Sequence, residues 1–260
     1  MPNFYTHLRF ARETFSRLTP ALQDSLTAEY DSFLLGNFGP DPLYFSGKQL
    51  REAGLGLHNG SGQAALGVYR AAMAHRKPYA RSFAAGYFLH FLLDSGIHPM
   101  IYQAMEQTGL THRNLEGELD RLFLIRDGIA PKDVFPDFSM PETFLMTAAR
   151  MAPGVTPQDY RNGLQNFRRI SLGLTAATGT PLRHAANGLS RISKIKGLRG
   201  AVLAREPEQA IIPWLFRLEG RYQDVLKQAP SALEQFLQNG ETGRDFGPIL
   251  DCNFSGKKVN

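Results

Sequence analysis

Histidine and carboxylate residues recur at helical spacing in the middle of the chain. His90 and Asp94 are four residues apart, and so are His112 and Glu116. Because residues i and i+4 lie on one face of a helix, each pair can direct two ligand atoms at a single point. Imidazole and carboxylate ligands without cysteine suit Zn²⁺ or a similar first-row ion. The spacing therefore predicts a metal site built on helices.

The residues around His90 and Asp94 are strongly apolar. A short His-x-x-x-Asp pattern is common by chance, and a lone histidine on an apolar helix is more often a packed core residue than a ligand. A carboxylate in apolar surroundings, however, is costly unless it is paired or bound to a metal ion. His98 follows Asp94 by four more residues and extends the same helical face. We therefore favour a metal site over a core histidine.

Helices must position these residues. Pro99 predicts the end of the helix that carries His90 to His98. Thr111 predicts the N-cap of a following helix that presents His112 and Glu116. Asp120 shares that ligand face but has the weaker claim as a ligand.

The rest of the chain shows the same helical character. Apolar spacing predicts helices over residues 1–35 with a break near Pro20, over 63–76 and over 206–238, with an extended tail after them. Strand-like alternation is lacking, so we expect an all-α fold, a single-domain helical bundle that spans residues 1–260. The proline-rich stretch 126–160 is then a set of connections within one domain.

Two segments outside the central helices carry further candidate ligands. Residues 36–47 read GNFGPDPLYFSG and predict a rigid loop, because Pro40 and Pro42 restrict the backbone on both sides of Asp41. Asp41 is then either a capping residue of a turn or a pre-positioned carboxylate. His58 precedes an Asn-Gly turn signal. His7, taken alone, is typical of an exposed histidine near a terminus.

Composition limits the classes of partner and compartment. The net charge of +5 favours anionic partners such as phosphate esters or membrane surfaces. Cys252 is the single cysteine, so an internal disulfide is excluded. The N-terminal sequence does not resemble a secretory signal, and we expect a cytoplasmic location. The segment 161–205 has nine Lys and Arg residues and no Asp or Glu, which indicates a solvated basic face or a peripheral contact with anionic membrane.

Eight residues form the candidate metal-ligand set in chain order: His7, Asp41, His58, His90, Asp94, His98, His112 and Glu116. With its flanking sequences, this set resembles the bacterial zinc-dependent phospholipases C, which share their fold with fungal zinc-dependent single-strand nucleases. The matching pieces are THLRF, GNFGPDPLYF, LHNG, HxxxDxxxH and HxxxE. Their order and approximate spacing agree over residues 5–120, and the remainder agrees only in length.

The resemblance implies an all-α bundle that holds two to three Zn²⁺ ions. The ligands it implies for the first zinc ion are Asp41, His58, His90 and Asp94. Those it implies for the second are His98, His112 and Glu116. Asp94 would bridge to a third ion that His7 also binds. In secreted members an N-terminal tryptophan completes that third site, whereas this sequence begins with Met1, so we expect the third site to be weak or empty.

The reaction we expect is hydrolysis of a phosphodiester by metal-activated water. Zinc lowers the pKa of bound water from about 15.7 to about 7. The resemblance assigns Asp41 a general-base role, and phospholipid headgroups are the first choice of substrate. Two alternatives stay open. A zinc-dependent nuclease would use the same ligands on nucleic acid, and a zinc-stabilised, non-catalytic binding protein would have its ions fully ligated.

Overall fold

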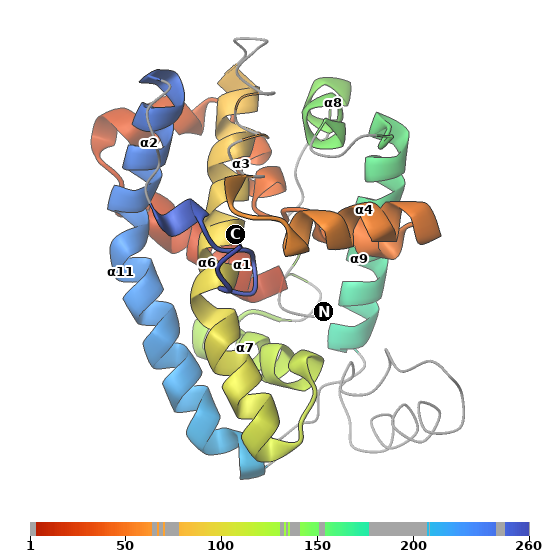
Figure 1. Ribbon diagram of the computed structural model, residues 1–260, viewed down its shortest axis with the longest axis vertical. Coiled ribbons are helices and arrows are strands. Elements are labelled where there is room, and N and C mark those ends of the chain that lie inside the picture. Colours follow the sequence, from red (N-terminus) through yellow and green to blue (C-terminus); the bar gives the residue numbers. More distant parts are fainter. Residues whose placement is uncertain are drawn as a thin grey trace. The chain divides into compact units, whose positions relative to one another are not determined.

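The computed structural model describes residues 4–63, 67, 70, 78–130, 133, 135, 141–150, 154–176, 207, 209–242 and 248–259. These residues form helices joined by short loops, and no strand occurs among them (Figure 1). The all-α prediction is therefore confirmed. The helices before the central one are α1 (Phe4–Phe15), α2 (Pro20–Thr27), α3 (Tyr30–Gly36), η1 (Asp41–Phe45) and α4 (Lys48–Asn59). The others are α6 (Pro78–Thr108), α7 (His112–Asp127), α8 (Glu142–Ala149), α9 (Pro157–Ala176), η4 (Gln209–Ile211), α11 (Ile212–Thr242) and η5 (Pro248–Leu250).

The chain divides into two compact units. The first contains Met1–Thr6, Pro99–Asp137 and Arg168–Tyr222, and the second contains His7–His98, Phe138–Phe167 and Gln223–Asn260. Four helices, α1, α6, α9 and α11, continue from one unit into the other. Whether the chain behaves as the single domain that we expect stays a prediction.

In the second unit, α3 and α6 approach each other at their backbones. A Cβ atom at Gly36 would lie 2.0 Å from the carbonyl oxygen of Phe83, and one at Gly86 would lie 2.0 Å from that of Phe33. Only glycine permits this approach. The contact places the residues after α3, from Asn37 onward, against the middle of α6.

The short helix η1 is also held closely on both sides within the second unit. A Cβ atom at Gly163 of α9 would lie 2.5 Å from the carbonyl oxygen of Pro42, and one at Gly54 of α4 would lie 3.2 Å from Cβ of Leu43. The segment expected to be a rigid loop thus contains a short 3₁₀ helix of five residues, with Asp41 at its first position. Its neighbours fix the place of Asp41.

The same unit joins distant parts of the chain through aromatic contacts. The rings of Phe88 in α6 and Phe236 in α11 stack with their centroids 4.2 Å apart. The tail is attached through a bridge from Ser61 to Asn253, and a second bridge, from Cys252 to Lys258, lies within the tail. This partly agrees with the extended tail that we expect, although η5 interrupts it.

The prediction that Pro99 ends the central helix is wrong. Helix α6 continues through Pro99 to Thr108. A proline removes one backbone hydrogen bond of a helix. Ile97 and Ile101, on either side, are buried to 1% and 0% exposure, so the packing on both sides outweighs the local preference of the proline.

The predicted start of the next helix is confirmed. Helix α7 begins at His112 after a capping box, in which the side chain of Thr111 accepts a hydrogen bond from the backbone N–H of Asn114 and the side chain of Asn114 accepts one from the backbone N–H of Thr111. Such a box satisfies two backbone donors at the start of a helix. The break near Pro20 is likewise confirmed, since Pro20 opens α2. The expected helix over 63–76 lies almost wholly outside the described residues.

Candidate metal centre

Six of the eight candidate ligands come together in the second unit. They are delivered by different elements: His7 by α1, Asp41 by η1, His58 by α4, and His90, Asp94 and His98 by α6. Among the described residues of this unit, two groups have ligand atoms that all lie within 4.8 Å of one another, and both contain His90. The first group is His7, His90 and Asp94, and the second is Asp41, His58 and His90.

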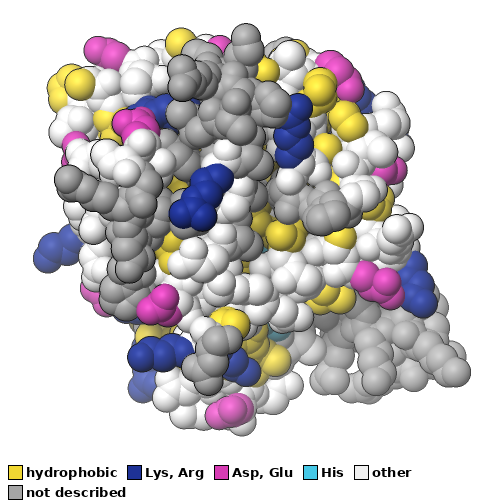
Figure 2. All heavy atoms as spheres, turned by 45° about the horizontal axis from the view of Figure 1, so that its top comes forward, with side chains coloured by type: hydrophobic (Ala, Val, Ile, Leu, Met, Phe, Trp, Pro, Cys, Tyr) yellow, Lys and Arg dark blue, Asp and Glu magenta, His cyan; other side chains and the backbone are white. Residues whose placement is uncertain are grey.

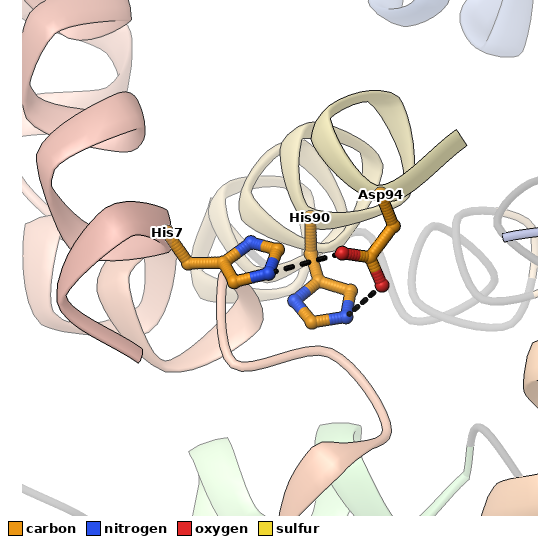
Figure 3. Close-up of side chains that lie close together, drawn as sticks. All are labelled: His7, His90 and Asp94. Atoms are coloured by element: carbon orange, nitrogen blue, oxygen red, sulfur yellow. Dashed lines mark ion pairs between the residues drawn. The ribbon is translucent and has the colours of Figure 1, made fainter. Parts of the chain in front are cut away.

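Asp94 lies at the centre of this cluster, and its two oxygens face different histidines. Oδ1 lies 3.1 Å from Nε2 of His7 and 3.5 Å from Nε2 of His98. Oδ2 lies 3.3 Å from Nε2 of His90 and 3.7 Å from Nε2 of His58. Figure 3 shows His7 approaching from α1 and His90 from one turn earlier on α6, each directed at its own oxygen. The carboxylate of Asp94 is therefore placed so that each of its oxygens could bind a separate cation.

Asp41 completes the group on the Oδ2 side. Its Oδ1 atom lies 3.3 Å from Nε2 of His58 and 3.9 Å from Nε2 of His90. Four ligand atoms at about 2.05 Å from a tetrahedral zinc ion are about 3.3 Å apart. The distances from the carboxylates of Asp41 and Asp94 to Nε2 of His58 and His90 run from 3.3 to 3.9 Å, so each carboxylate is spaced from these two rings much as two ligands of one zinc ion are.

The other ring nitrogens of three histidines are held by oxygen atoms. Nδ1 of His90 lies 3.1 Å from the carbonyl oxygen of Asn37, and Nδ1 of His98 lies 2.7 Å from that of Phe254. Because a carbonyl oxygen only accepts, Nδ1 carries the proton in both rings and Nε2 presents its lone pair to the cluster. Nδ1 of His58 lies 2.8 Å from the hydroxyl of Tyr44 and 3.2 Å from the carbonyl oxygen of Gly54. Metal-binding histidines are typically oriented in this way.

Two buried nitrogens in the cluster have no hydrogen-bond partner among the described residues. They are Nδ1 of His7 and Nε2 of His90. A buried polar atom left without a partner is costly, and a metal ion would satisfy Nε2 of His90. The two rings stack with their centroids 4.1 Å apart.

Exposure rises across the cluster from His90 to Asp41. The side chains of His90 and Asp94 are 1% and 5% exposed, whereas those of Asp41 and His58 are 14% and 15% exposed. On the face drawn in Figure 2, very little histidine surface is visible. Within this cluster, Asp41 and His58 are therefore closer to solvent than His90 and Asp94 are.

Phe254, in the C-terminal tail, packs against the cluster. Its ring centroid lies 4.7 Å from that of His58, 5.8 Å from that of His90 and 5.1 Å from that of Phe91. The same residue accepts the hydrogen bond from His98 through its carbonyl oxygen. It thus contributes an apolar wall and orients a histidine.

Burial and mutual charge set the ionisation of the metal-free cluster. Burial and the neighbouring His7 hold the pKa of His90 below its usual value. Burial also opposes a charge on His58, but hydrogen bonds to Asp41 and Asp94 outweigh it and raise its pKa to about 10. For Asp94, burial is outweighed by His98, His90 and His7, which hold its pKa well below the usual range. The cluster therefore keeps Asp94 ionised, as a metal ligand must be.

The two remaining candidate ligands belong to the first unit. Nε2 of His112 lies 2.8 Å from Oε1 of Glu116, as expected for neighbours one helical turn apart. Glu116 is buried, whereas the side chain of His112 is 31% exposed. The spacing argument therefore holds for this pair, and their role as ligands stays a prediction.

Asp120 has a different role from the ligand that its spacing suggested. Its oxygens accept hydrogen bonds from the backbone N–H groups of Tyr5 and Thr6, and from the hydroxyl of Thr6. These groups belong to the first turn of α1, where unpaired N–H groups and the helix dipole favour a carboxylate. Asp120 thus caps the helix that carries His7.

Sequence reasoning missed several residues that support the cluster. Asn37, Tyr44 and Phe254 contact its histidines, yet none of them lies at a ligand-like spacing. Their contacts join segments that are far apart in the chain, apart from that of Tyr44 with His58. A local signal existed for Asn37 and Tyr44, which both lie inside the GNFGPDPLYF segment, but none existed for Phe254.

Comparisons with known proteins agree with this geometry. The family model described as zinc dependent phospholipase C matches residues 6–154, more than half of the chain, and this range includes all eight candidate ligands. No curated protein and no solved structure matches the chain. On the extent of the family match, the chain belongs to the zinc-dependent phospholipase C family, which is a family of hydrolases.

Proposed function

We propose that this chain is a zinc-dependent phosphodiester hydrolase that cleaves phospholipid headgroups as a phospholipase C does. The observation that carries the proposal is the buried carboxylate of Asp94, whose two oxygens face separate sets of histidines. A carboxylate in this arrangement can join two metal ions, and paired ions are typical of phosphodiester hydrolysis. The family supports the same reaction class.

Within this proposal, each ion has its own ligands. Asp41, His58, His90 and Asp94 would hold the first zinc ion, which the carboxylate-to-imidazole distances of 3.3 to 3.9 Å support. His7 and Asp94, whose Nε2 and Oδ1 atoms lie 3.1 Å apart, would hold the third ion. The second ion takes His98, His112 and Glu116, a set that rests on the resemblance of the motifs. We therefore propose two to three ions per chain.

Bound zinc would lower the pKa of a coordinated water and stabilise negative charge on the phosphoryl oxygens. Asp41 orients the attacking water and accepts its proton, for which its carboxylate on the exposed side of the cluster is suited. The ring of Phe254 excludes bulk water from one side of His58 and His90. Tyr44 and Asn37 hold the rings of these two histidines in place.

The structure describes only a small part of the segments on which the expected partners and location depend. Much of the basic segment 161–205, for which we expect contact with anionic membrane, lies outside the described residues, and in its described part Arg161 pairs with Glu142 of α8. Among the described helices, none is sufficiently long and apolar to cross a bilayer. A peripheral encounter with phospholipid, from a cytoplasmic location, remains part of the proposal.

The test is hydrolysis by the zinc-loaded protein of phosphatidylcholine and of single-stranded DNA in parallel. We expect diacylglycerol and phosphocholine to be released, because water adds across the phosphorus–oxygen bond to glycerol. Cleavage of DNA without any cleavage of phospholipid would identify a nuclease instead. Tightly bound zinc without hydrolysis of any diester in a panel of headgroups would favour a non-catalytic binding protein.

A further inference from the structure

The first three turns of α11, in the first unit, have one buried and one exposed face. The buried face consists of Ile211 from η4 and Leu215, Leu218 and Tyr222, which are 0% to 6% exposed. On the opposite face, Phe216 is 72% exposed and Ile212, one turn earlier, is 39% exposed. Phe216 is the most exposed of the large hydrophobic side chains among the described residues. A phenylalanine so exposed, next to another apolar side chain, indicates a contact surface.

The charge around Phe216 is positive. The guanidinium group of Arg217 lies over the ring of Trp214, 4.8 Å from its centroid, and no carboxylate in the described part of the chain pairs with it. The nearby Glu219 is bonded by both terminal nitrogens of Arg126 on α7, so its charge is neutralised. Pro213 and Gly220, also exposed, add no charge.

We propose that this surface, comprising Ile212, Pro213, Phe216 and Arg217, docks the protein on a phospholipid bilayer that carries anionic headgroups. Apolar side chains inserted below the headgroups and a cationic side chain among them are what such binding requires. This inference rests on the proposed function, because a phospholipase C must reach lipid in a bilayer. A second copy of the chain is a poorer fit, since stable protein interfaces use about 20–30 residues on each side.

The experiment is sedimentation of the zinc-loaded protein with vesicles of equal parts phosphatidylcholine and phosphatidylserine. Phe216→Ser is expected to weaken binding by about tenfold or more, because insertion of its ring into the bilayer is lost. Arg217→Ser is expected to reduce the preference for these vesicles over pure phosphatidylcholine by about fivefold and to weaken the salt dependence of binding. Met146→Ser is the matched control, since Met146 is 41% exposed on α8 in the other unit.

A gain-of-signal variant tests the same surface without loss of an apolar group. In Phe216→Trp the new indole is expected to shift its fluorescence to shorter wavelength when these vesicles are added. Binding of Phe216→Ser equal to that of the unaltered protein, or an indole that does not respond, would overturn the inference. So would a dimer of the unaltered protein that Phe216→Ser dissociates, because the surface would then join two copies.

Hydrolysis of a short-chain phosphatidylcholine below its micelle concentration separates this inference from the proposed function. Phe216→Ser is expected to retain this activity, since a dissolved substrate needs no docking. If the unaltered protein hydrolyses no diester, the proposed function fails while the vesicle experiment still decides the surface. If hydrolysis proceeds but Phe216→Ser binds vesicles normally, only the docking surface is wrong.

Discussion

A Cβ atom at Gly39 would lie 2.5 Å from Cδ2 of His90, closer than a side chain can approach. Gly39 has a φ of +55°, in the left-handed region that glycine adopts most readily. The turn after α3 therefore runs directly against the imidazole ring that both ligand groups share. This contact ties the glycine of the GNFGPDPLYF segment to the position of His90.

Gly39→Ala is expected to displace His90 and to lower zinc affinity as well as stability. The left-handed backbone costs about 1–2 kcal/mol for alanine, and the clash adds about 1–3 kcal/mol. Gly109→Ala is the matched control, because Gly109 has a φ of +68° but no heavy atom within 4 Å of its Cβ position. Chemical denaturation and zinc titration of both variants measure the difference. Equal effects in the two variants would show that the contact with His90 is unimportant.

Asp94→Asn is expected to lower phosphodiester hydrolysis by at least about 100-fold. Loss of a metal ligand should exceed the 10–100-fold effect of losing a residue that only orients a ligand. The amide keeps the shape of the carboxylate but loses its charge and one acceptor oxygen. Asp224→Asn, at an exposed position of α11, should change the rate by less than about twofold. Small, equal effects of both substitutions on initial rates would refute the assignment of Asp94.

Tyr44→Phe is expected to weaken zinc binding by about 10–100-fold while the fold is retained. The substitution removes the hydroxyl that lies 2.8 Å from Nδ1 of His58 and leaves the ring in place. Tyr160→Phe is the control, because its hydroxyl makes a longer hydrogen bond, 3.4 Å, to the carbonyl oxygen of Gly39. Competition for zinc with a chromogenic chelator measures both. If the two variants bind zinc equally well, the orienting role of Tyr44 is wrong.

Asp120→Asn is expected to change how stability depends on pH. Burial raises the pKa of Asp120 well above its usual range, although the hydrogen bonds from Thr6 and Tyr5 oppose this. Because the pKa is higher in the folded state, the stabilising contribution is complete below the unfolded pKa of about 3.9 and is lost as pH rises through the folded pKa. Asparagine does not titrate.

The free energy of unfolding of the unaltered protein, minus that of Asp120→Asn, should therefore increase as pH falls from about 8 to about 5. Denaturant titrations of both proteins across this range measure the difference. A difference that is constant, or that decreases as pH falls, would contradict the raised pKa of Asp120.

The sequence predicted which candidate ligands share a helical face better than it predicted what surrounds them. His90, Asp94 and His98 are found by spacing, because one helix places residues four apart on one face whatever it packs against. The start of α7 at His112 is equally local, since Thr111 and Asn114 cap it on their own. Local rules therefore predicted both the shared face of His90, Asp94 and His98 and the start of α7.

Features that depend on tertiary packing could not be predicted from the sequence. Pro99 follows the local rule for a helix end, but the burial of Ile97 and Ile101 keeps α6 continuous. Phe254 meets His98 across 156 residues of chain, and no spacing rule covers such a contact. Asp120 shares a helical face with Glu116, but its oxygens are taken by the start of α1.

Metal content tests the central claim most directly. Elemental mass spectrometry of the purified protein should find two to three zinc ions per chain, and clearly fewer in Asp94→Ala, because Asp94 contacts four histidines of the cluster. Circular dichroism establishes that both proteins are folded. A folded protein without tightly held zinc, even after dialysis against zinc, would contradict the account, and so would an unchanged zinc content in Asp94→Ala.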